Sequence, residues 1–385
     1  MKNKILVIIL TLFLTGCYDQ KELNNIAILS ATEINKVNNE YIVSAEIVNP
    51  QSPEKQTHIE APFIIYEGHG KTIQEAYRMI KLSSSRYLYP DHLQVIIINE
   101  KIAKEDINQI LDFYLRDPSI RTEFNVLIGK DDSILNITTP IDGISSTSIV
   151  ETLKTSNRYL GVSNLITLNE LTIMSLNPNT EIILPSIEIT KQTKNEDKLE
   201  NTEDTKVDSM YKLSGLAIFK NNKLLGYLSN DESISYNIIK NNVKNSILTY
   251  ECLPKKYLSI EMINSKSTIK TKNKEININI DIDATLNESA CNIKLNDNKE
   301  LNELENKIES YLNKKISNNI NNIRNKYNSD VFGFLDEIYK HDYKTYTQIK
   351  DNWYTQTYKN IPINIKSNIN IVGIGNVMEG INEKN

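Results

Sequence analysis

The residue with the clearest chemical role is Cys17, which follows a stretch typical of an export signal. Two lysines in Met1–Lys4 precede an apolar run over Ile5–Leu14, and the small pair Thr15-Gly16 comes directly before the cysteine. This order matches a bacterial lipobox, in which a peptidase needs a slim backbone and the thiol takes up a diacylglyceryl group. The alternative is a plain secretory signal followed by a chance cysteine. We predict a signal peptide over residues 1–16 and lipid attachment at Cys17.

An acyl anchor would hold the mature protein at a membrane without a spanning helix. The apolar run is about half of the ~20 residues that a spanning helix needs, and no other segment approaches ~18 uninterrupted apolar residues. A diacylglyceryl thioether supplies two acyl chains, the number that stable anchoring requires. We therefore expect the polar remainder of the chain outside the cytoplasm, anchored to the lipid bilayer through acylated Cys17.

The charge balance bears on two classes of partner. The 385 residues carry 44 Lys+Arg against 49 Asp+Glu, a net charge of −5. Removal of Lys2 and Lys4 with the signal leaves 42 basic against 49 acidic side chains, a net charge of −7. Such a chain lacks the basic excess of a nucleic-acid binder, and its net charge gives no attraction to anionic lipid. We expect no nucleic acid partner, and we expect the acyl chains to hold the protein at the membrane.

Residues that could support catalysis or metal binding do not fall into a working pattern. Gly68-His69-Gly70-Lys71-Thr72 matches only part of a phosphate-binding loop, because Ile65 stands where the first glycine should be. The sequence has no Gly-x-Ser-x-Gly motif and no histidine pair with the i, i+4 spacing of a zinc hydrolase. We predict no catalytic residue, no metal and no cofactor. The four histidines are scattered, at His58, His69, His92 and His341.

Cys252 and Cys291 leave two alternatives open. In an exported protein they could form a disulfide across a loop of about forty residues, worth ~4 kcal/mol on the chain-entropy model. The alternative, which we favour, is two unpaired thiols buried as small apolar residues, since nothing nearby gives them metal or redox spacing. Neither alternative determines the function.

The first half of the mature chain alternates predicted strands and helices. Ile26–Ile34 and Tyr41–Val48 alternate apolar and polar residues around a polar turn, which predicts a β-hairpin. Thr72–Glu75 has the spacing of a capping box and predicts a helix to about Leu88. This alternation predicts a mixed or parallel sheet covered by helices. Further apolar patterns predict strands at Leu93–Ile98 and Phe124–Ile128 and a helix over Ile107–Leu115.

The second half follows a polar segment. Residues 192–208 hold six acidic residues and no aromatic, which predicts a linker. Leu213–Phe219 and Lys223–Leu228 flank Lys220-Asn221-Asn222 and predict a second hairpin, whose Asn residues tolerate positive φ. Elsewhere Asn is so abundant in this chain that we give its clusters less weight than usual as turn evidence. Ile276–Ile282 alternates with Asn and Asp and predicts a half-exposed antiparallel strand. A last strand is predicted over Ile361–Val372, interrupted near Lys366–Asn368.

Leu301–Tyr327 has the clearest helical pattern. Its apolar residues recur at steps of three and four, which predicts one amphipathic helix about 40 Å long. The apolar stripe could be a coiled-coil seam between chains or a face packed on a sheet, and we favour the sheet. The predicted fold class is α+β and multi-domain, with mixed sheets packed with helices and this long helix in the C-terminal domain. The predicted divisions are a signal peptide (1–16), an N-terminal α/β region (17–191), a polar linker (192–208), a C-terminal α+β domain (209–376) and a tail (377–385).

Four blocks of sequence resemble, in the same order, one known family. The segment from Gly16 to Ala27 is similar to the start of mature Ger(x)C proteins, the lipoprotein C subunits of spore germinant receptors, although Tyr18 stands where the family has Trp. Pro90–Lys130, with Leu115–Arg121 at its core, resembles the first-domain signature of the family. The last two blocks resemble its C-terminal opening hairpin and its late helix and junction, and they are Gly215–Glu232 and Lys326–Phe334 followed by Trp353.

The resemblance implies a receptor subunit without catalytic activity. Family members are multi-domain α+β lipoproteins on the outer face of the spore inner membrane, beside two integral-membrane subunits, A and B. Cys17 is the only functional position that the family pattern transfers to this chain. We therefore expect a lipid-anchored subunit that is needed for nutrient-triggered germination. Its candidate docking surfaces are the hairpin Leu213–Leu228 and the helix Leu301–Tyr327, with packing inside the fold as the alternative for each.

Two other functions share part of this pattern. A solute-binding lipoprotein of an uptake system would have the same anchor and α/β content, but it should enclose a ligand between two lobes. A cell-wall-processing enzyme would need an acid/base pair in a cleft. Ligand-dependent stabilisation would indicate the first, and hydrolysis of peptidoglycan would indicate the second.

Overall fold

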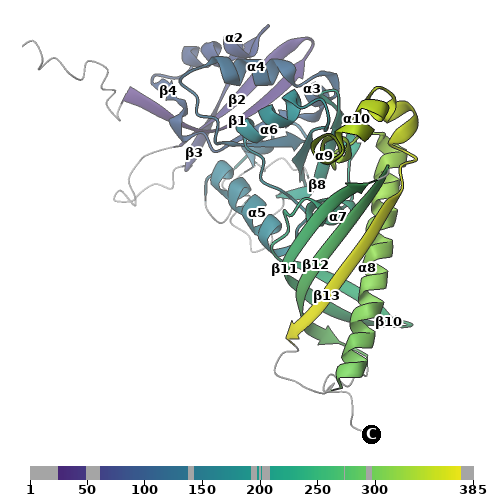
Figure 1. Ribbon diagram of the computed structural model, residues 1–385. Coiled ribbons are helices and arrows are strands. Elements are labelled where there is room, and N and C mark those ends of the chain that lie inside the picture. The colour runs from purple at the N-terminus through teal and green to yellow at the C-terminus, as the bar shows by residue number, and fades with distance from the viewer. Residues whose placement is uncertain are drawn as a thin grey trace, which may run out of the picture.

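The computed structural model arranges the chain as two sheets with packed helices (Figure 1). The predicted signal peptide, Cys17, most of the linker and the tail lie outside the residues that the structure describes. Within the described ranges, no helix is long and apolar enough to cross a bilayer. The described residues are 25–48, 61–137, 143–191, 197–198, 201, 209–272, 274–291 and 297–373.

The first sheet draws strands from both sides of the predicted linker. Its order is β3-β2-β1-β5-β6-β7-β8-β9, with the short β4 paired to β1. The neighbours β1, β5, β6 and β7 are parallel and the flanking pairs are antiparallel, so the sheet is mixed, as predicted. The strands are β1 (Ile26–Val37), β2 (Glu40–Val48), β3 (Phe63–Gly70), β4 (Tyr87–Tyr89), β5 (Val95–Asn99), β6 (Asn125–Gly129), β7 (Ile183–Ile189), β8 (Tyr211–Lys220) and β9 (Lys223–Tyr227).

Helices cover both faces of this sheet because its central strands are apolar on both sides. β5 is buried along its whole length, as expected for a parallel strand between two helical layers. Ile96 and Ile98 pack in one cluster with α2, α3, α4 and α6, whereas Val95 and Ile97 pack with α5 on the other face. The helices are α2 (Ile73–Met79), α3 (Glu100–Glu105), α4 (Asn108–Arg116), α5 (Ser145–Tyr159) and α6 (Leu168–Leu176).

Both predicted hairpins are confirmed, and both turn on asparagine pairs. Asn38 and Asn39 join β1 to β2, Asn221 and Asn222 join β8 to β9, and all four have positive φ between 50° and 64°. Positive φ at both central positions matches the twist of two-stranded hairpins, and Asn tolerates it. The tolerance of positive φ that we predicted for the Asn residues of the second hairpin is confirmed at Asn221 and Asn222.

The helix predicted from Thr72 to about Leu88 is shorter than expected. α2 ends at Met79 and continues as one 3-10 turn, η2 (Ile80–Leu82). Leu88 lies instead in β4, where it is buried and pairs with Ala27 of β1. Serines follow η2, and the hydroxyl of Ser84 donates to the carbonyl of Arg86, a local bond that competes with helical hydrogen bonding.

The long helix α8 (Asn298–Tyr327) packs its apolar stripe on the second sheet, as we favoured. Ile308, Ile316 and Ile323 of α8 lie in one buried cluster with Ile278 and Ile282 of β12. The sheet has the order β10-β11-β12-β13, and α7 (Asn230–Ile239) and α9 (Phe334–His341) add to the same core. Its strands are β10 (Ser246–Leu253), β11 (Lys256–Lys272), β12 (Glu275–Ser289) and β13 (Ile363–Gly373).

The alternation predicted for Ile276–Ile282 is confirmed in β12, but only one of its two neighbouring strands is antiparallel to it. It pairs antiparallel with β11 and parallel with β13. Its outward amides and carboxylates bond across to β13, where Asn364 Nδ2 donates to Asn277 Oδ1 at 3.1 Å and Asn370 Nδ2 donates to Asp283 Oδ1 at 3.2 Å. The predicted interruption near Lys366–Asn368 is wrong, since β13 runs unbroken through these residues.

Three side chains of α8 close the outer edge of β13. Outward N–H groups of β13 donate to side chains of α8 that lie one helical turn apart. This row of hydrogen bonds, which we call the comb, occupies backbone donors at an edge that could otherwise pair with another strand. Four helical residues rise about 6 Å and two strand residues about 6.6 Å, so the two repeats match. The three bonds are Ser367 N to Asn313 Oδ1 (2.8 Å), Ile369 N to Glu309 Oε1 (2.9 Å) and Ile371 N to Glu305 Oε1 (2.8 Å).

Cys252 and Cys291 form a disulfide, so the unpaired thiols that we favoured are wrong. Cys252 lies near the end of β10 and Cys291 just beyond β12, with Cα atoms 6.5 Å apart. Two successive antiparallel turns, β10 to β11 and β11 to β12, fold the chain back so that these ends meet. A separation of 39 residues hides this proximity in the sequence.

The turn after α8 joins the two sheets. Asn328 ends α8 with a left-handed conformation, φ 49°, and the residues around it reach the β8–β9 hairpin of the first sheet. Ser329 and Asp330 are fully buried. The bonds to the hairpin are Tyr327 OH to the Tyr227 carbonyl (2.7 Å), Lys220 Nζ to the Asn328 carbonyl (2.7 Å) and the Ser329 hydroxyl to the Phe219 carbonyl.

A buried glutamate holds a loop against the α5 face of the first sheet. Glu33 of β1 is 2% exposed, and its carboxylate accepts the N–H groups of Ser133 (2.9 Å) and Leu135 (3.1 Å). Burial raises its pKa from the ordinary 4.5 to about 7, and the nearby charge of Asp132 adds to the rise. The folded state therefore holds this proton at pH values where the unfolded chain has lost it.

We predict that Glu33→Gln changes how stability depends on pH. Between pH 4.5 and 7 the native Glu33 binds more protons than the unfolded one, so its contribution to the free energy of unfolding falls as pH rises and the loss is complete above pH 7. Between pH 5 and 8, the free energy of unfolding of the natural chain should fall by on the order of 3 kcal/mol relative to that of Glu33→Gln. Urea unfolding of both chains across this range measures it, and a pH-independent difference would contradict the raised pKa.

Candidate functional site between α2, α4 and β4

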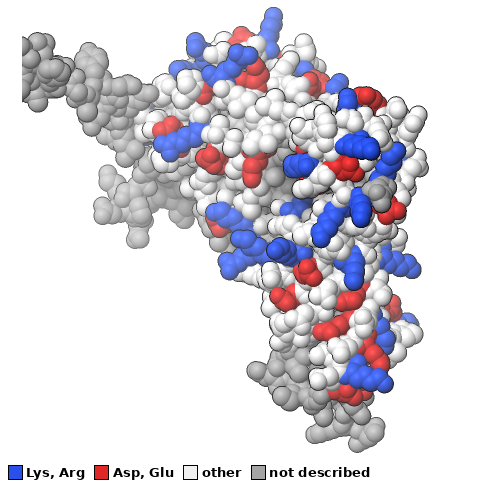
Figure 2. Space-filling model, in the orientation of Figure 1, with Lys and Arg blue, Asp and Glu red and all other residues white. Residues whose placement is uncertain are grey.

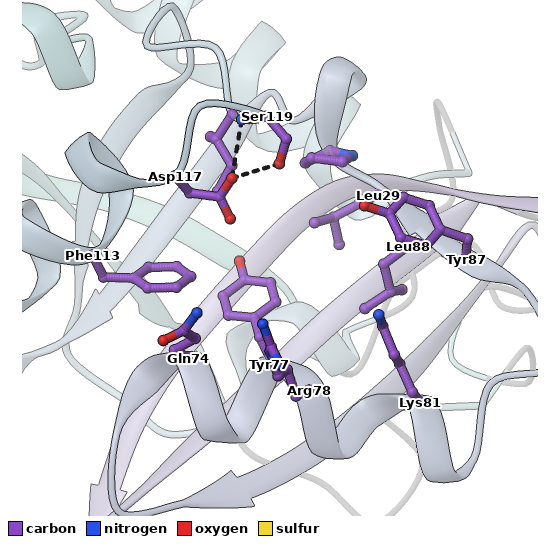
Figure 3. Close-up of a pocket in the computed structure, with 12 residues that line it drawn as sticks. Leu29, Gln74, Tyr77, Arg78, Lys81, Tyr87, Leu88, Phe113, Asp117 and Ser119 are labelled. Carbon is purple, nitrogen blue, oxygen red and sulfur yellow. Dashed lines mark hydrogen bonds between the residues drawn. The ribbon is translucent and has the colours of Figure 1, made fainter. Parts of the chain in front are cut away.

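A groove with an apolar floor lies on one face of the first sheet (Figure 3). Its cavity has a volume of about 170 Å³. Leu29 of β1 and Leu88 of β4 line the inner side, and Tyr77 of α2 lies beside Phe113 of α4. The two rings stack with centroids 5.2 Å apart. The groove thus offers aromatic and aliphatic surface to whatever enters it.

Charged side chains of both signs rim this groove. Arg78 and Lys81 project toward it from the helical side, and Asp117 faces them from the segment after α4 (Figure 3). The Asp117 carboxylate accepts the Ser119 N–H at 3.0 Å and the Ser119 hydroxyl at 2.6 Å, so it is held in place by its own turn. Lys81 Nζ lies 5.1 Å from the ring centroid of Tyr87, within cation–π distance. The rim can therefore attract an anionic group on one side and a cationic group on the other.

α2 is positioned by its cap and by glycines of β3. The Thr72 side chain accepts the N–H of Glu75 at 3.1 Å, as the predicted cap requires. A Cβ at Gly68 would clash with the Ala76 carbonyl, and one at Gly70 would also meet the first turn of α2. The block that resembled part of a phosphate loop is thus a strand-to-helix connection in which glycine permits close packing.

α4 is positioned by a hydroxyl network under the groove. Tyr114 is 1% exposed, and its hydroxyl shares hydrogen bonds with Thr32 of β1 (2.7 Å) and with Tyr77 of α2 (2.9 Å). Burial raises the pKa of Tyr114 to about 12, so it stays a neutral donor. Both walls of the groove are therefore fixed to the sheet through one side chain.

The block Leu115–Arg121, singled out by resemblance, runs along this groove. Arg116 Nε bonds Asp112 at 2.7 Å on α4, and Arg121 approaches Asp91 at 3.7 Å across the far end. A second hollow of about 770 Å³ continues the groove toward the start of α4. The sequence did not predict a groove, because its walls come from segments about forty residues apart. The residues shared by the two hollows are Gln74, Arg78, Phe113 and Asp117.

The groove can bind, but its lining lacks the parts of a familiar hydrolase or metal site. Its lining residues include no histidine and no cysteine. Across the described ranges, no group of three or more His, Cys, Asp or Glu side chains could hold a metal ion. His69, His92 and His341 lie in β3, η3 (Pro90–His92) and α9, and His58 is outside the described residues. What the arrangement offers is shape, aromatic surface and paired charges.

The two predicted docking surfaces are largely taken up by internal packing. In the β8–β9 hairpin, Leu216 and Phe219 are fully buried. A Cβ at Gly215, whose φ is +82°, would clash with the Leu228 carbonyl, and one at Gly226 would meet the Tyr327 ring. The apolar stripe of α8 lies on the second sheet. Cys17, the predicted lipid-attachment residue, is outside the described residues, so acylation stays a prediction.

Comparison with known families accounts for the order of these elements. A family model described as "Spore germination protein N-terminal domain" matches residues 19–189, and one described as "Spore germination B3/ GerAC like, C-terminal" matches residues 214–375. The chain belongs to the GerAC family of spore germination proteins. This confirms the resemblance to C subunits of germinant receptors.

Individual GerAC relatives match over most of their length. "Spore germination protein KC" of Bacillus subtilis (strain 168) is 27% identical over 380 residues, covering 94% of this chain and 93% of the relative. "Spore germination protein GerQC" of Bacillus cereus is 24% identical over 322 residues, covering 79% and 81%. The structure described as "Crystal Structure of the GerBC protein" aligns with a TM-score of 0.57 at 17% identity, over 89% of this chain and 96% of that one, and shows the same fold.

We predict that Tyr114→Phe destabilises the groove region. The change removes the hydroxyl that joins Thr32 and Tyr77 and leaves buried polar groups without their partner, which should lower the free energy of unfolding by about 1–3 kcal/mol. Tyr343→Phe is the control, because Tyr343 is 63% exposed and should change stability by less than about 0.5 kcal/mol. Urea unfolding followed by tyrosine fluorescence compares the two variants. Equal stabilities would show that the hydroxyl network does not contribute to the free energy of unfolding.

Proposed function

We propose that this spore germination protein is a non-catalytic lipoprotein subunit of a spore germinant receptor, needed for nutrient-triggered germination. The observation that carries the proposal is the match of both GerAC domains, in order, behind a lipobox that ends at Cys17. Acylated Cys17 would hold the folded part on the outer face of the spore inner membrane. Its partners there would be the integral-membrane A and B subunits and the bilayer itself.

A short tether supports a role beside membrane partners. Eight residues lie between Cys17 and Ile26, where β1 begins, and a fully extended chain spans at most about 30 Å over this separation. Such an anchor confines the fold to a thin layer and raises its effective concentration toward neighbours in the same membrane. Docking on the receptor subunits then needs only modest intrinsic affinity.

The groove favours the receptor subunit over the two other functions considered. It lies on one face of one sheet, between α2, α4 and β4, whereas a solute-binding lipoprotein should close two lobes around its ligand. Asp117 in the groove bonds Ser119, not a second carboxyl group with which it could act as an acid/base pair. The division into domains at 192–208 is part of this proposal, and the two family matches end and begin on either side of that segment.

We predict that Cys17→Ala abolishes lipid labelling and impairs nutrient germination. Without the thiol no diacylglyceryl group can be attached, so the protein should leave the membrane fraction and fail to support its receptor. Palmitate labelling of sporulating cells, membrane fractionation, and germination scored with nutrient and with a receptor-independent trigger measure these effects. Only the nutrient response should be lost.

Tyr18→Trp is the matched control for this experiment. It alters the residue next to Cys17 toward the one that the resembling family carries, and it keeps the cysteine. Labelling and germination should therefore match the natural chain. If the Cys17→Ala protein stays on the membrane and germination is normal, the anchored-subunit proposal fails.

A further inference from the structure

One ten-residue segment has a charge opposite to that of the chain. Arg78–Tyr87, which we call the basic segment, contains Arg78, Lys81 and Arg86 and no acidic residue, in a mature chain of net charge −7. Figure 2 shows Lys and Arg side chains over α2 and α4, with Asp and Glu side chains among them. The net charge of the whole protein thus hides a local basic surface.

The same segment exposes apolar side chains. Leu82 is 84% exposed, Met79 41% and Tyr87 41%. Met79 and Leu82 are three residues apart across the α2–η2 junction and project to the same side. Basic residues next to exposed Leu, Met and Tyr are the combination found on helices that lie in the interface of anionic membranes.

The basic segment lies at the end of the fold where the tether enters. Tyr87 pairs with Ile26, the first residue of β1, and Lys81 lies against the Tyr87 ring. Ile26 follows Cys17 by nine residues, so this surface cannot be more than about 30 Å plus its own width from an acylated Cys17. The short tether and the positive charge of the basic segment both favour contact between this surface and the lipid.

We infer that the basic segment rests on the anionic bilayer surface, with Leu82 and Met79 in the headgroup region and Arg78, Lys81 and Arg86 against lipid phosphates. This inference rests on the proposed anchoring at Cys17. The anchor supplies attachment, and the segment supplies orientation, because a second contact beside the tether restricts how the fold can turn. The groove, which Arg78 and Lys81 also rim, then opens close to the membrane surface.

The test uses the full mature chain with Cys17→Ser, which cannot be acylated. It should co-sediment with vesicles of phosphatidylglycerol and phosphatidylcholine and not with phosphatidylcholine alone, and binding should weaken toward ~0.15 M salt. Each basic residue at such a surface raises the affinity for the vesicles about fivefold. The triple change Arg78→Gln, Lys81→Gln and Arg86→Gln should therefore weaken binding about a hundredfold. Leu82→Gln alone should weaken it about tenfold, and its 84% exposure means that folding is unaffected.

A charge-matched control comes from α8. Lys299→Gln, Lys307→Gln and Lys314→Gln remove the same charge from exposed positions on the long helix and should leave binding almost unchanged, since charges beyond ~10 Å are screened. Absence of binding to the anionic vesicles, or equal binding by the two triple variants, overturns the inference. Failure of the proposed anchor would appear differently, as missing palmitate on the natural chain while the unacylated chain still binds vesicles.

Discussion

The turn that follows α8 determines how the two sheets are placed relative to each other. The hydroxyls of Tyr327 and Ser329 donate to backbone carbonyls of the β8–β9 hairpin, and Lys220 of the hairpin donates to a carbonyl of the turn. Asp330 in the same turn accepts the N–H groups of Phe334 and Leu335 and so begins α9. Asp330 is fully buried, and this burial raises its pKa to about 6. Because Ser329 and Asp330 are fully buried, their hydrogen bonds can be satisfied in only one relative position of hairpin and helix.

This rigid junction gives the molecule two distinct ends. β4, with the groove and the basic segment, lies at one end, and the second sheet with α8 lies at the other (Figure 1). An anchor before β1 would attach at the first end. The second sheet would then project away from the lipid, with its wet face of Asn and Asp side chains exposed to solvent or to neighbouring subunits.

Local patterns made some parts of the structure predictable. The steps of three and four in α8 predicted both the helix and its packing face, and the apolar run at Leu93–Ile98 predicted the strand that the structure shows as β5. Leu88 was misplaced because its spacing from Ile80 fits a helical face, whereas the helical segment ends in η2 and Leu88 pairs with Ala27 of β1. The disulfide and the groove depend on register and on crossings between distant segments, which periodicity does not encode. Only the resemblance at Leu115–Arg121 marked the groove, and it did so without indicating a cavity.

The comb between α8 and β13 has a consequence for self-association. A sheet grows by adding strands where backbone donors are unsatisfied, and a row of such donors at an edge is a template for polymerisation. On β13 three of these donors are occupied by Asn313, Glu309 and Glu305. With these three donors occupied, this stretch of β13 has no free N–H group to offer at these positions to a strand from a neighbouring copy of the chain.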